Sequence, residues 1–492
     1  MTTDAGFILL LYLTVLLTLG YYSYRSTRAT PEDYFLAGRS LGPVLLFFSV
    51  FATNITAFTF LGVTGQSYQL GVGMYGFVAF GTAFLTPAMF YIVGFRSWLV
   101  GKRYGYMTQA EILGNRWDSR AVSLVVLALT LLYTIPYLVT SIIGAGTALE
   151  AITGGALPYP VGCTLVVAVT TIYTSLGGMR GTAWTNVFQG LMFLIVGLAI
   201  FVLLSQELGG VVAATEGVLA RRPDLLTKAD HFTPGSWFSY LLISPLAVVA
   251  FPHVFVRLMS SRSTRFLKTT VTIYPLTVLL TFAPAVYIGL WGSWALPDMS
   301  GRLDAVFPLM LATYLPASLT GLGLAAILAA IMSSIDAMLL TISNLVLRDG
   351  VEPRVSLPSQ EWVKWGRLVV AAVALLSLIM ALIRPGTIFA IATFAFTGYA
   401  CLVPVMIAAL YWRRSTSQGA LAALLGSAVL LPVYHFTPYL DWTLWGNTLP
   451  IIPLLVITIV LLVGVSCATR PATHATHRFF SLFDSIYQKK AP

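Results

Sequence analysis

The sequence predicts an all-α polytopic membrane protein with about thirteen transmembrane helices. Of its 492 residues, 58% are hydrophobic and only 9% are charged, a balance that water-soluble globular domains do not show. Apolar stretches of about 20 residues, the length that crosses a hydrocarbon core of about 30 Å, recur along the whole chain. The predicted spans are residues 6–24, 42–67, 73–95, 121–148, 159–176, 184–206, 237–257, 269–294, 321–345, 368–383, 387–411, 420–436 and 449–467.

The positions of the basic residues predict an external N-terminus and a cytoplasmic C-terminus, because cytoplasmic loops retain positive charge during insertion. In this orientation the first span, which lacks the basic start of a signal peptide, stays in the membrane. The net charge of +10 is dispersed over many loops, so it indicates insertion and contact with anionic lipid, and it excludes nucleic acid as a partner. All but five of the 28 Lys and Arg residues then lie in the cytoplasm, and the external ones are Arg221, Arg222, Lys228, Arg302 and Arg384.

Three segments outside the spans are expected to form surface helices. They are residues 207–236, residues 302–314 and the amphipathic tail that begins at His477. No soluble domain is visible, and no eukaryotic targeting signal is recognised. The predicted location is therefore the cytoplasmic membrane of a bacterium or an archaeon.

The sequence does not predict an enzyme. Cys163, Cys401 and Cys467 all fall within spans, which indicates apolar packing and no disulfide framework. His474 and His477 have no Cys or carboxylate nearby in the sequence to complete a metal site. No Ser/His/Asp set or pair of carboxylates converges at one membrane depth.

Polar residues in the middle of span 42–67 predict a broken helix. Thr53, Asn54, Thr56 and Thr59 lie at one depth, and Gly62, Gly65 and Gln66 follow them. Polar residues within a span face the protein interior or a water-filled path far more often than lipid. A break whose freed carbonyls bind a cation is typical of secondary transporters, and hydrogen bonding to neighbouring helices is the alternative.

Span 321–345 has a face of small residues that admits close approach of another backbone, because Ala330, Ser333, Ser334 and Ala337 recur at three- and four-residue spacing. Asp336 is the only carboxylate well inside any predicted span. An uncompensated charge there would cost several kcal/mol, so Asp336 is protonated, hydrogen-bonded or paired with a cation.

Residues 177–189 form the third polar region. Gly177 and Gly178 predict a tight cytoplasmic turn, after which Thr185, Asn186 and Gln189 open the next helix. Thr185 is also suited to be a simple helix cap.

Five sequence strings, in the order in which the family carries them, resemble the sodium:solute symporter family, which includes proline, pantothenate, monocarboxylate, sugar and sialic acid carriers. The resemblance covers nearly the whole chain. The strings are "DYFLAGRSLGP", "GYMTQAEILGNRW", "GGMRGTAWTNVFQ", "FPHVFVRLMSS" and "AAIMSSIDA".

The resemblance implies the leucine-transporter fold, built from two inverted repeats of five helices. Span 237–257 is then the second broken helix, and Pro245 and Pro252 are its expected interruptions. The implied parts of the chain are an extra helix and loop at 1–41, the first repeat at 42–206, an external loop at 207–236, the second repeat at 237–411, and two further spans with a cytoplasmic tail at 412–492.

The resemblance also implies Na⁺ as coupling ion, bound between the first break and span 321–345. Carbonyl and hydroxyl oxygens suit a monovalent cation because their dipoles replace its hydration shell without adding full negative charge. The implied ligands are the carbonyls of Ala52, Ile55 and Ala330 and the hydroxyls of Ser333 and Ser334.

One position departs from the family. Many members have an Asp after the "WT" of the string at 177–189, and here that residue is Asn186. The hypothesis is that Asp336 supplies the missing charge and forms, with Thr185 and Ser333, a second cation site or a proton-titrating group.

The transported solute is predicted only by class. The candidate pocket residues are uncharged, so a small organic acid or an amino acid is preferred over a hexose, and its carboxylate would meet helix N-termini. Phe396 and Tyr399 are also suited to ordinary helix packing, and His253 and Arg257 are interpreted as interfacial anchors. The candidates are Asn54, Thr56, Thr59, Gln66, Tyr75, Ser244, Phe396 and Tyr399.

Three alternatives stay open at this point. The first is a proton-coupled carrier of the same solutes, with Asp336 as the titrating group. The second is a sugar or sialic acid symporter of the same implied family. A transporter-like solute sensor that acts through a partner is the alternative from a different class. Solute flux separates a carrier from a sensor.

Overall fold

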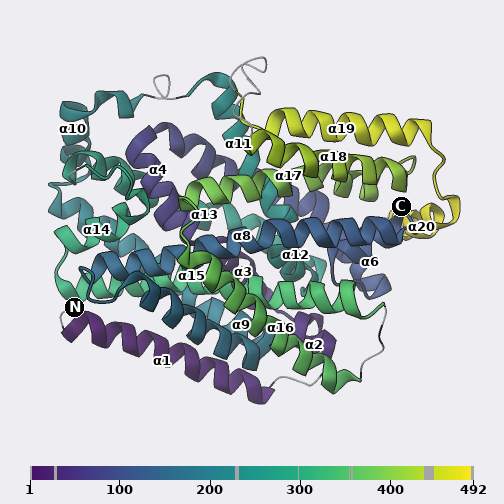
Figure 1. Cartoon of the computed structure of the whole chain (residues 1–492), viewed down its shortest axis with the longest axis horizontal. Helices are drawn as coiled ribbons and strands as arrows, with labels where there is room; N and C mark the ends of the chain where they lie inside the picture. Colours follow the sequence, from purple (N-terminus) through teal and green to yellow (C-terminus); the bar gives the residue numbers. More distant parts are fainter. Residues whose placement is uncertain are drawn as a thin grey trace.

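A computed structural model describes residues 3–26, 30–227, 232–296, 298–353, 355, 358–436 and 448–488. Its described elements are helices, apart from one isolated bridge between Leu41 and Ser261, so the predicted all-α class is confirmed (Figure 1). Lys228 of the predicted external loop lies outside the described residues.

The predicted spans all fall on helices. These are α1 (Thr3–Ser26), α3 (Pro43–Asn54) with η2 (Phe58–Gly62) and α4 (Val63–Leu70), η3 (Tyr75–Gly81) with α5 (Thr82–Met89), η4 (Phe90–Gly94) and α6 (Phe95–Tyr104), α8 (Arg120–Ile152), α9 (Tyr159–Glu207), α11 (Pro234–Ala250) with α12 (Pro252–Met259), α13 (Thr264–Ala295), α15 (Ala317–Leu345), α16 (Ser359–Leu382), α17 (Ile388–Tyr411), α18 (Ser417–Phe436) and α19 (Ile451–Ala468).

Short helices also form outside the spans, including the three surface segments that the sequence predicts. They are α2 (Pro31–Leu36), η1 (Ala37–Arg39), α7 (Gln109–Arg116), α10 (Val211–Arg221), η5 (Pro223–Leu226), η6 (Leu303–Ala305), α14 (Val306–Tyr314), η7 (Val346–Val351) and α20 (Thr473–Gln488).

Ten of the described helices are long and apolar enough to cross a membrane, and two bent pairs raise this number to twelve. α9 has 49 residues, which corresponds to roughly 75 Å of helix and exceeds a single crossing. It kinks at Gly178, where φ is 51°, between predicted spans 159–176 and 184–206. A Cβ at this position would lie 2.7 Å from the ring of Tyr34, so the kink requires glycine.

Both predicted broken helices are bent. The α3–α4 pair bends by 48° around Ile55, whose backbone is extended, and the α11–α12 pair bends by 51° at Phe251. Pro252 pushes the residue before it into the extended region and starts a new helix, as its missing amide favours. The expected interruption at Pro245 is wrong, because α11 continues through that residue.

α15 lies at the centre of the molecule, and its whole apolar window is buried. It packs against α1, α8, α9 and α16, while α13 packs on the first broken helix and α17 packs against α11. The N-terminus lies at the same end of the molecule as α10 and α14, and α20 lies at the opposite end (Figure 1).

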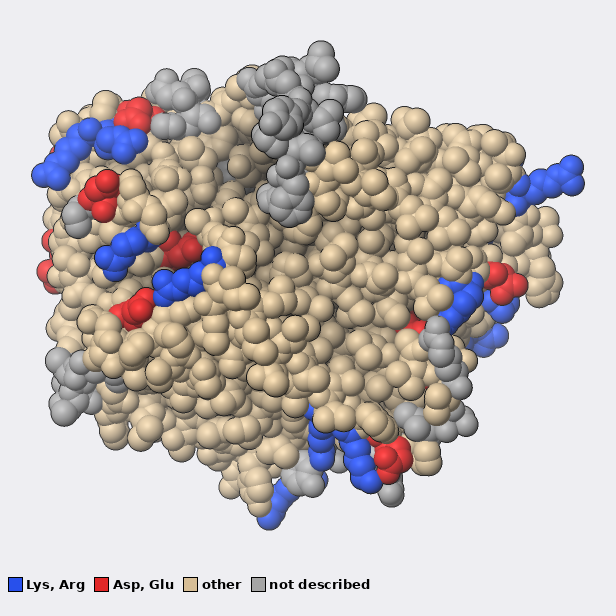
Figure 2. Space-filling view, viewed as in Figure 1, with Lys and Arg blue, Asp and Glu red and all other residues tan. Residues whose placement is uncertain are grey.

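Charged side chains are scarce on the face shown in Figure 2. They gather at its margins and in one hollow near the end that holds α14. A broad uncharged surface of this kind is what contact with lipid requires.

Candidate functional site at two helix breaks

The first helix break lies directly against α15. The Ser333 hydroxyl donates to the carbonyl of Ala52 at 3.0 Å and to the carbonyl of Ala330 at 2.9 Å. Ile55, the residue at the break, is fully buried. Its amide donates to the Ala52 carbonyl at 3.3 Å. The structure therefore brings three of the five predicted sodium ligands into contact, a set of oxygens suited to a hard monovalent cation.

Ser334 has different partners from its neighbour. Its hydroxyl donates to the Ile331 carbonyl at 2.7 Å and lies 3.3 Å from the Ser141 hydroxyl on α8. Ser141 is a polar group that the sequence reasoning missed. Its only signal is a hydroxyl in the middle of span 121–148.

The polar side chains of the first break stabilise it. Thr56 shares a hydrogen bond of 3.1 Å with the Tyr137 hydroxyl, and its own hydroxyl accepts from the Phe58 amide at 3.1 Å. The Thr59 hydroxyl accepts from the Thr56 amide at 3.5 Å. The Asn54 side-chain amide donates to the Tyr274 hydroxyl on α13. These contacts tie the break to α8 and α13.

Aromatic rings surround the second break. The ring of Phe251 lies 5.1 Å from those of Phe396 and Tyr399 and 5.2 Å from that of Tyr137. Phe396 also contacts Phe58, at 5.0 Å, so it joins the two breaks. The Tyr399 hydroxyl is hydrogen-bonded to Thr134. The two predicted aromatic candidates thus lie at the breaks.

Three predicted solute contacts lie elsewhere. Ser244 accepts a hydrogen bond from Thr82 at 2.9 Å between α11 and α5. Tyr75 is 37% exposed and its ring lies beside Tyr287. Gln66 is half-buried on α4, and within the described part of the chain no hydrogen bond ties its side chain to either break.

Asp336 forms a buried ion pair with Arg257 across 3.4 Å. Their side chains are 0% and 1% exposed. Tyr173 and Thr185 donate to the other carboxylate oxygen at 3.1 and 3.4 Å. Asn186 instead donates to Thr53 at 3.2 Å and does not join this group.

The interpretation of Arg257 and His253 as interfacial anchors is wrong. The bend before α12 directs Arg257 into the bundle, where it also donates to Ser49 on α3 at 3.1 Å and to Thr182 on α9 at 3.4 Å. His253 is fully buried and stacks 5.1 Å from Phe251. Neither of its ring nitrogens has a hydrogen-bond partner within the described residues.

Two broken helices in an apolar helical bundle, the first of them broken directly against the buried helix α15, are typical of secondary transporters. Residues 34–426 match the sodium:solute symporter family, and this protein belongs to that family. It is 27% identical over 436 residues to the sodium/pantothenate symporter of Escherichia coli (strain K12), with 86% of this chain and 89% of the relative covered. It is 25% identical over 498 residues to the osmoregulated proline transporter OpuE of Bacillus subtilis (strain 168), with 98% of each covered.

Solved structures share the fold. A Na⁺-coupled sialic acid symporter in a substrate-bound outward-open state has a TM-score of 0.76 at 20% identity, with 95% of this chain and 98% of the other covered. MhsT in complex with L-phenylalanine has a TM-score of 0.51 at 13% identity, with 86% and 98% covered. The fold is the leucine-transporter fold that the sequence resemblance implies.

Membership of the family makes this protein a multi-pass membrane transporter with Na⁺ as its coupling ion, and not an enzyme. The solute is a separate question, because the relatives carry different ones.

Proposed function

We propose that this protein imports a small organic acid, of the monocarboxylate or pantothenate type, or an amino acid, together with sodium, across the cytoplasmic membrane. The observation that carries the proposal is the contact of the Ser333 hydroxyl with the Ala52 and Ala330 carbonyls at the first break. The Ile55 carbonyl and the Ser334 hydroxyl complete the proposed sodium site.

Sodium acts by stabilising the first break against α15. An ion changes a conformational equilibrium only by its different affinity for the two states. Here the ion joins a broken helix of one repeat to α15 of the other, so a relative movement of the repeats changes its coordination. A membrane potential adds about 2.3 kcal/mol per charge per 100 mV to drive the inward step.

The solute binds between the two breaks. Asn54, Thr56 and Thr59 supply polar groups there, and Phe396 and Tyr399 supply aromatic surface. The first amides of α12 lie at the second break and favour a carboxylate, because a helix N-terminus carries partial positive charge. His253, with both ring nitrogens unbonded within the described residues, adds a polar group at the same break.

Thermal stability of the purified protein tests this proposal, because a ligand that binds only the folded state raises stability. We expect a carboxylate or an amino acid to raise the melting temperature in sodium buffer and not in potassium buffer. A ligand at 100 times its Kd would add about 2.7 kcal/mol.

Other outcomes would support the alternatives. Stabilisation that depends on pH and not on sodium would indicate proton coupling. Stabilisation only by sugars would replace the solute class. Sodium-dependent binding without flux in proteoliposomes would indicate a sensor.

A further inference from the structure

A cavity of about 700 Å³ opens at the end of the molecule that holds α14, the predicted external side. It is the hollow with charged side chains in Figure 2. It is lined by the end of α8 with Gly154 and Gly155, by residues 301–305 with Leu309, and by Arg384, Gly386 and Thr387. We call this cavity the vestibule. It holds two of the five basic residues predicted to be external, Arg302 and Arg384, together with Glu150 and Asp304.

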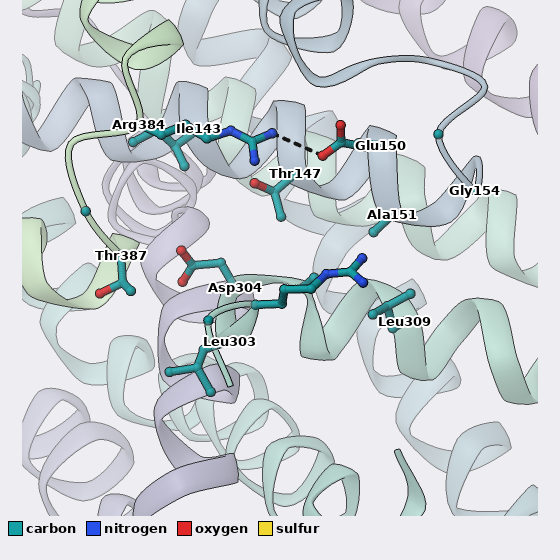
Figure 3. A pocket seen from close by; sticks show the side chains of 15 residues that line it. Ile143, Thr147, Glu150, Ala151, Gly154, Leu303, Asp304, Leu309, Arg384 and Thr387 are labelled. Atoms are coloured by element: carbon teal, nitrogen blue, oxygen red, sulfur yellow. Dashed lines mark hydrogen bonds and ion pairs between the residues drawn. The ribbon is translucent and has the colours of Figure 1, made fainter. Parts of the chain in front are cut away.

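On one wall of the vestibule, the charged side chains pair with each other. Arg384 donates to Glu150 at 3.1 Å, and its guanidinium lies 3.5 Å from the centre of the Tyr159 ring. The second Glu150 oxygen accepts from the Tyr159 amide at 3.3 Å. Figure 3 shows this pair along one side of the cavity, with Thr147 between it and Asp304 (Figure 3). Arg384 and Glu150 therefore have little need of a ligand.

The facing wall leaves opposite charges open. One Asp304 oxygen accepts from the Ile388 amide at 3.1 Å and caps the start of α17, and the other oxygen has no hydrogen bond within the described residues. Arg302 is exposed, and within the same residues its side chain makes no ion pair or hydrogen bond. Among the described residues, the Arg302 guanidinium and one Asp304 oxygen thus line the cavity without a hydrogen-bond or ion-pair partner.

The vestibule lies beside η2 and α4, the helical segment that follows the first break. The Leu303 carbonyl packs so closely on α4 that a Cβ at Gly65 would lie 2.5 Å from it. Ile388 packs against Gly62 in the same way, at 3.2 Å from the position of such a Cβ. Leu303, which lines the vestibule, and Ile388, whose amide bonds Asp304, therefore both pack on the helical segment that follows the first break.

We propose that the vestibule is an external binding site for zwitterionic amino acids, in which Arg302 binds the carboxylate and Asp304 binds the ammonium group. This inference rests on the proposed function and selects the amino acid from its two solute classes. A solute with one charge would satisfy one wall residue and leave the other unpaired, whereas a zwitterion forms a charge-assisted hydrogen bond with each.

The titration of Asp304 gives a pH dependence. Burial raises the pKa of Asp304 to about 6, and Glu150, Arg302 and Arg384 are the charged groups of the neighbouring walls. Protonation below this pH removes the negative charge that holds the ammonium group. We expect amino acid binding in the vestibule to weaken as the pH falls through 6, and Asp304→Asn to remove this dependence. Binding that is equally tight well below and well above this pKa would contradict the role of Asp304.

Equilibrium binding to the purified full-length protein in sodium-free choline buffer tests the site, because the proposed central site requires sodium. The probes are L-alanine, L-leucine and L-proline, each with its N-acetyl derivative and its amide. We expect at least one amino acid to bind saturably and its two derivatives to bind at least about tenfold more weakly. Arg302→Gln and Asp304→Asn should each weaken binding by a similar factor.

Arg222→Gln is the matched control, since Arg222 is a predicted external arginine that pairs with Asp224 outside the vestibule. It should leave binding unchanged. Arg302 is exposed, and in the Asp304→Asn variant the side-chain carbonyl oxygen would still accept from the Ile388 amide. Both variants should therefore fold, which their melting temperatures check.

Two results would overturn the vestibule site: absence of sodium-free binding by all three amino acids, or binding that neither variant weakens. If sodium-dependent stabilisation persists in that case, the proposed function stands and the vestibule site fails. Sodium-free binding that requires Arg302 and Asp304, without any sodium-dependent stabilisation, would support the vestibule and refute the proposed sodium-dependent site at the first break.

Discussion

Replacing Asp336 by Asn should lower the free energy of unfolding by about 3–5 kcal/mol, because it leaves Arg257 buried without its counter-charge. The two side chains are almost completely inaccessible, and their ion pair joins α12 to α15. Ser49 and Thr182 would still accept from the guanidinium, but a hydroxyl does not neutralise it. Denaturant titration in detergent measures the change.

A double-mutant cycle separates the ion pair from the effect of each residue alone. Arg257→Met should also destabilise the protein, because it leaves Asp336 buried without its counter-charge. The loss of unfolding free energy in the double variant should be smaller than the sum of the two single losses by about 1–3 kcal/mol. Lys364→Gln breaks the exposed pair with Glu361 and should cost less than about 1 kcal/mol. Strict additivity of the Asp336 and Arg257 variants would refute a coupled pair.

Asp336→Asn also tests the hypothesis that Asp336 forms a second cation site or a proton-titrating group. If Asp336 bound a second sodium or a transported proton, Asp336→Asn would change the ion-to-solute ratio or the pH dependence of flux. Because Arg257 already supplies a positive charge 3.4 Å away, we expect both properties to stay as in the unaltered protein. A changed ratio would restore Asp336, with Thr185, as a cation site.

Replacing Ser333 by Ala should raise the sodium concentration for half-maximal transport by at least about tenfold, because it removes a ligand dipole from the ion. Ser333 is the residue whose hydroxyl contacts carbonyls on both sides of the proposed site. Uptake measured over a range of sodium concentrations gives the shift. Solute binding at saturating sodium should change little.

Two serines of the same helix serve as comparisons. Ser334→Ala should have a smaller effect on sodium dependence, since its hydroxyl bonds Ile331 and lies near Ser141. Ser343→Ala removes a hydroxyl that donates to the Gly366 carbonyl away from the break, and should leave sodium dependence unchanged. A sodium dependence that Ser333→Ala leaves intact would place the ion elsewhere.

Much of the site was accessible from sequence because its signals are local. Thr53, Asn54, Thr56 and Thr59 marked the first break, which the structure places at Ile55. For the second broken helix the expected interruptions are Pro245 and Pro252, and only Pro252 produces one. A proline inside a helix removes one hydrogen bond, whereas the residue before Pro252 also leaves the helical region.

The sequence by itself determined the helical spans, the two breaks and the small-residue face of α15. Each of these depends on residues that are close together in the sequence. The tertiary structure decided which groups meet. Arg257 and Asp336 are 79 positions apart, and their pairing depends on the 51° bend before α12. Helix packing also decides that Ser333, and not Ser334, contacts the first break. It likewise brings three separate segments together around the vestibule. No local sequence pattern encodes either arrangement.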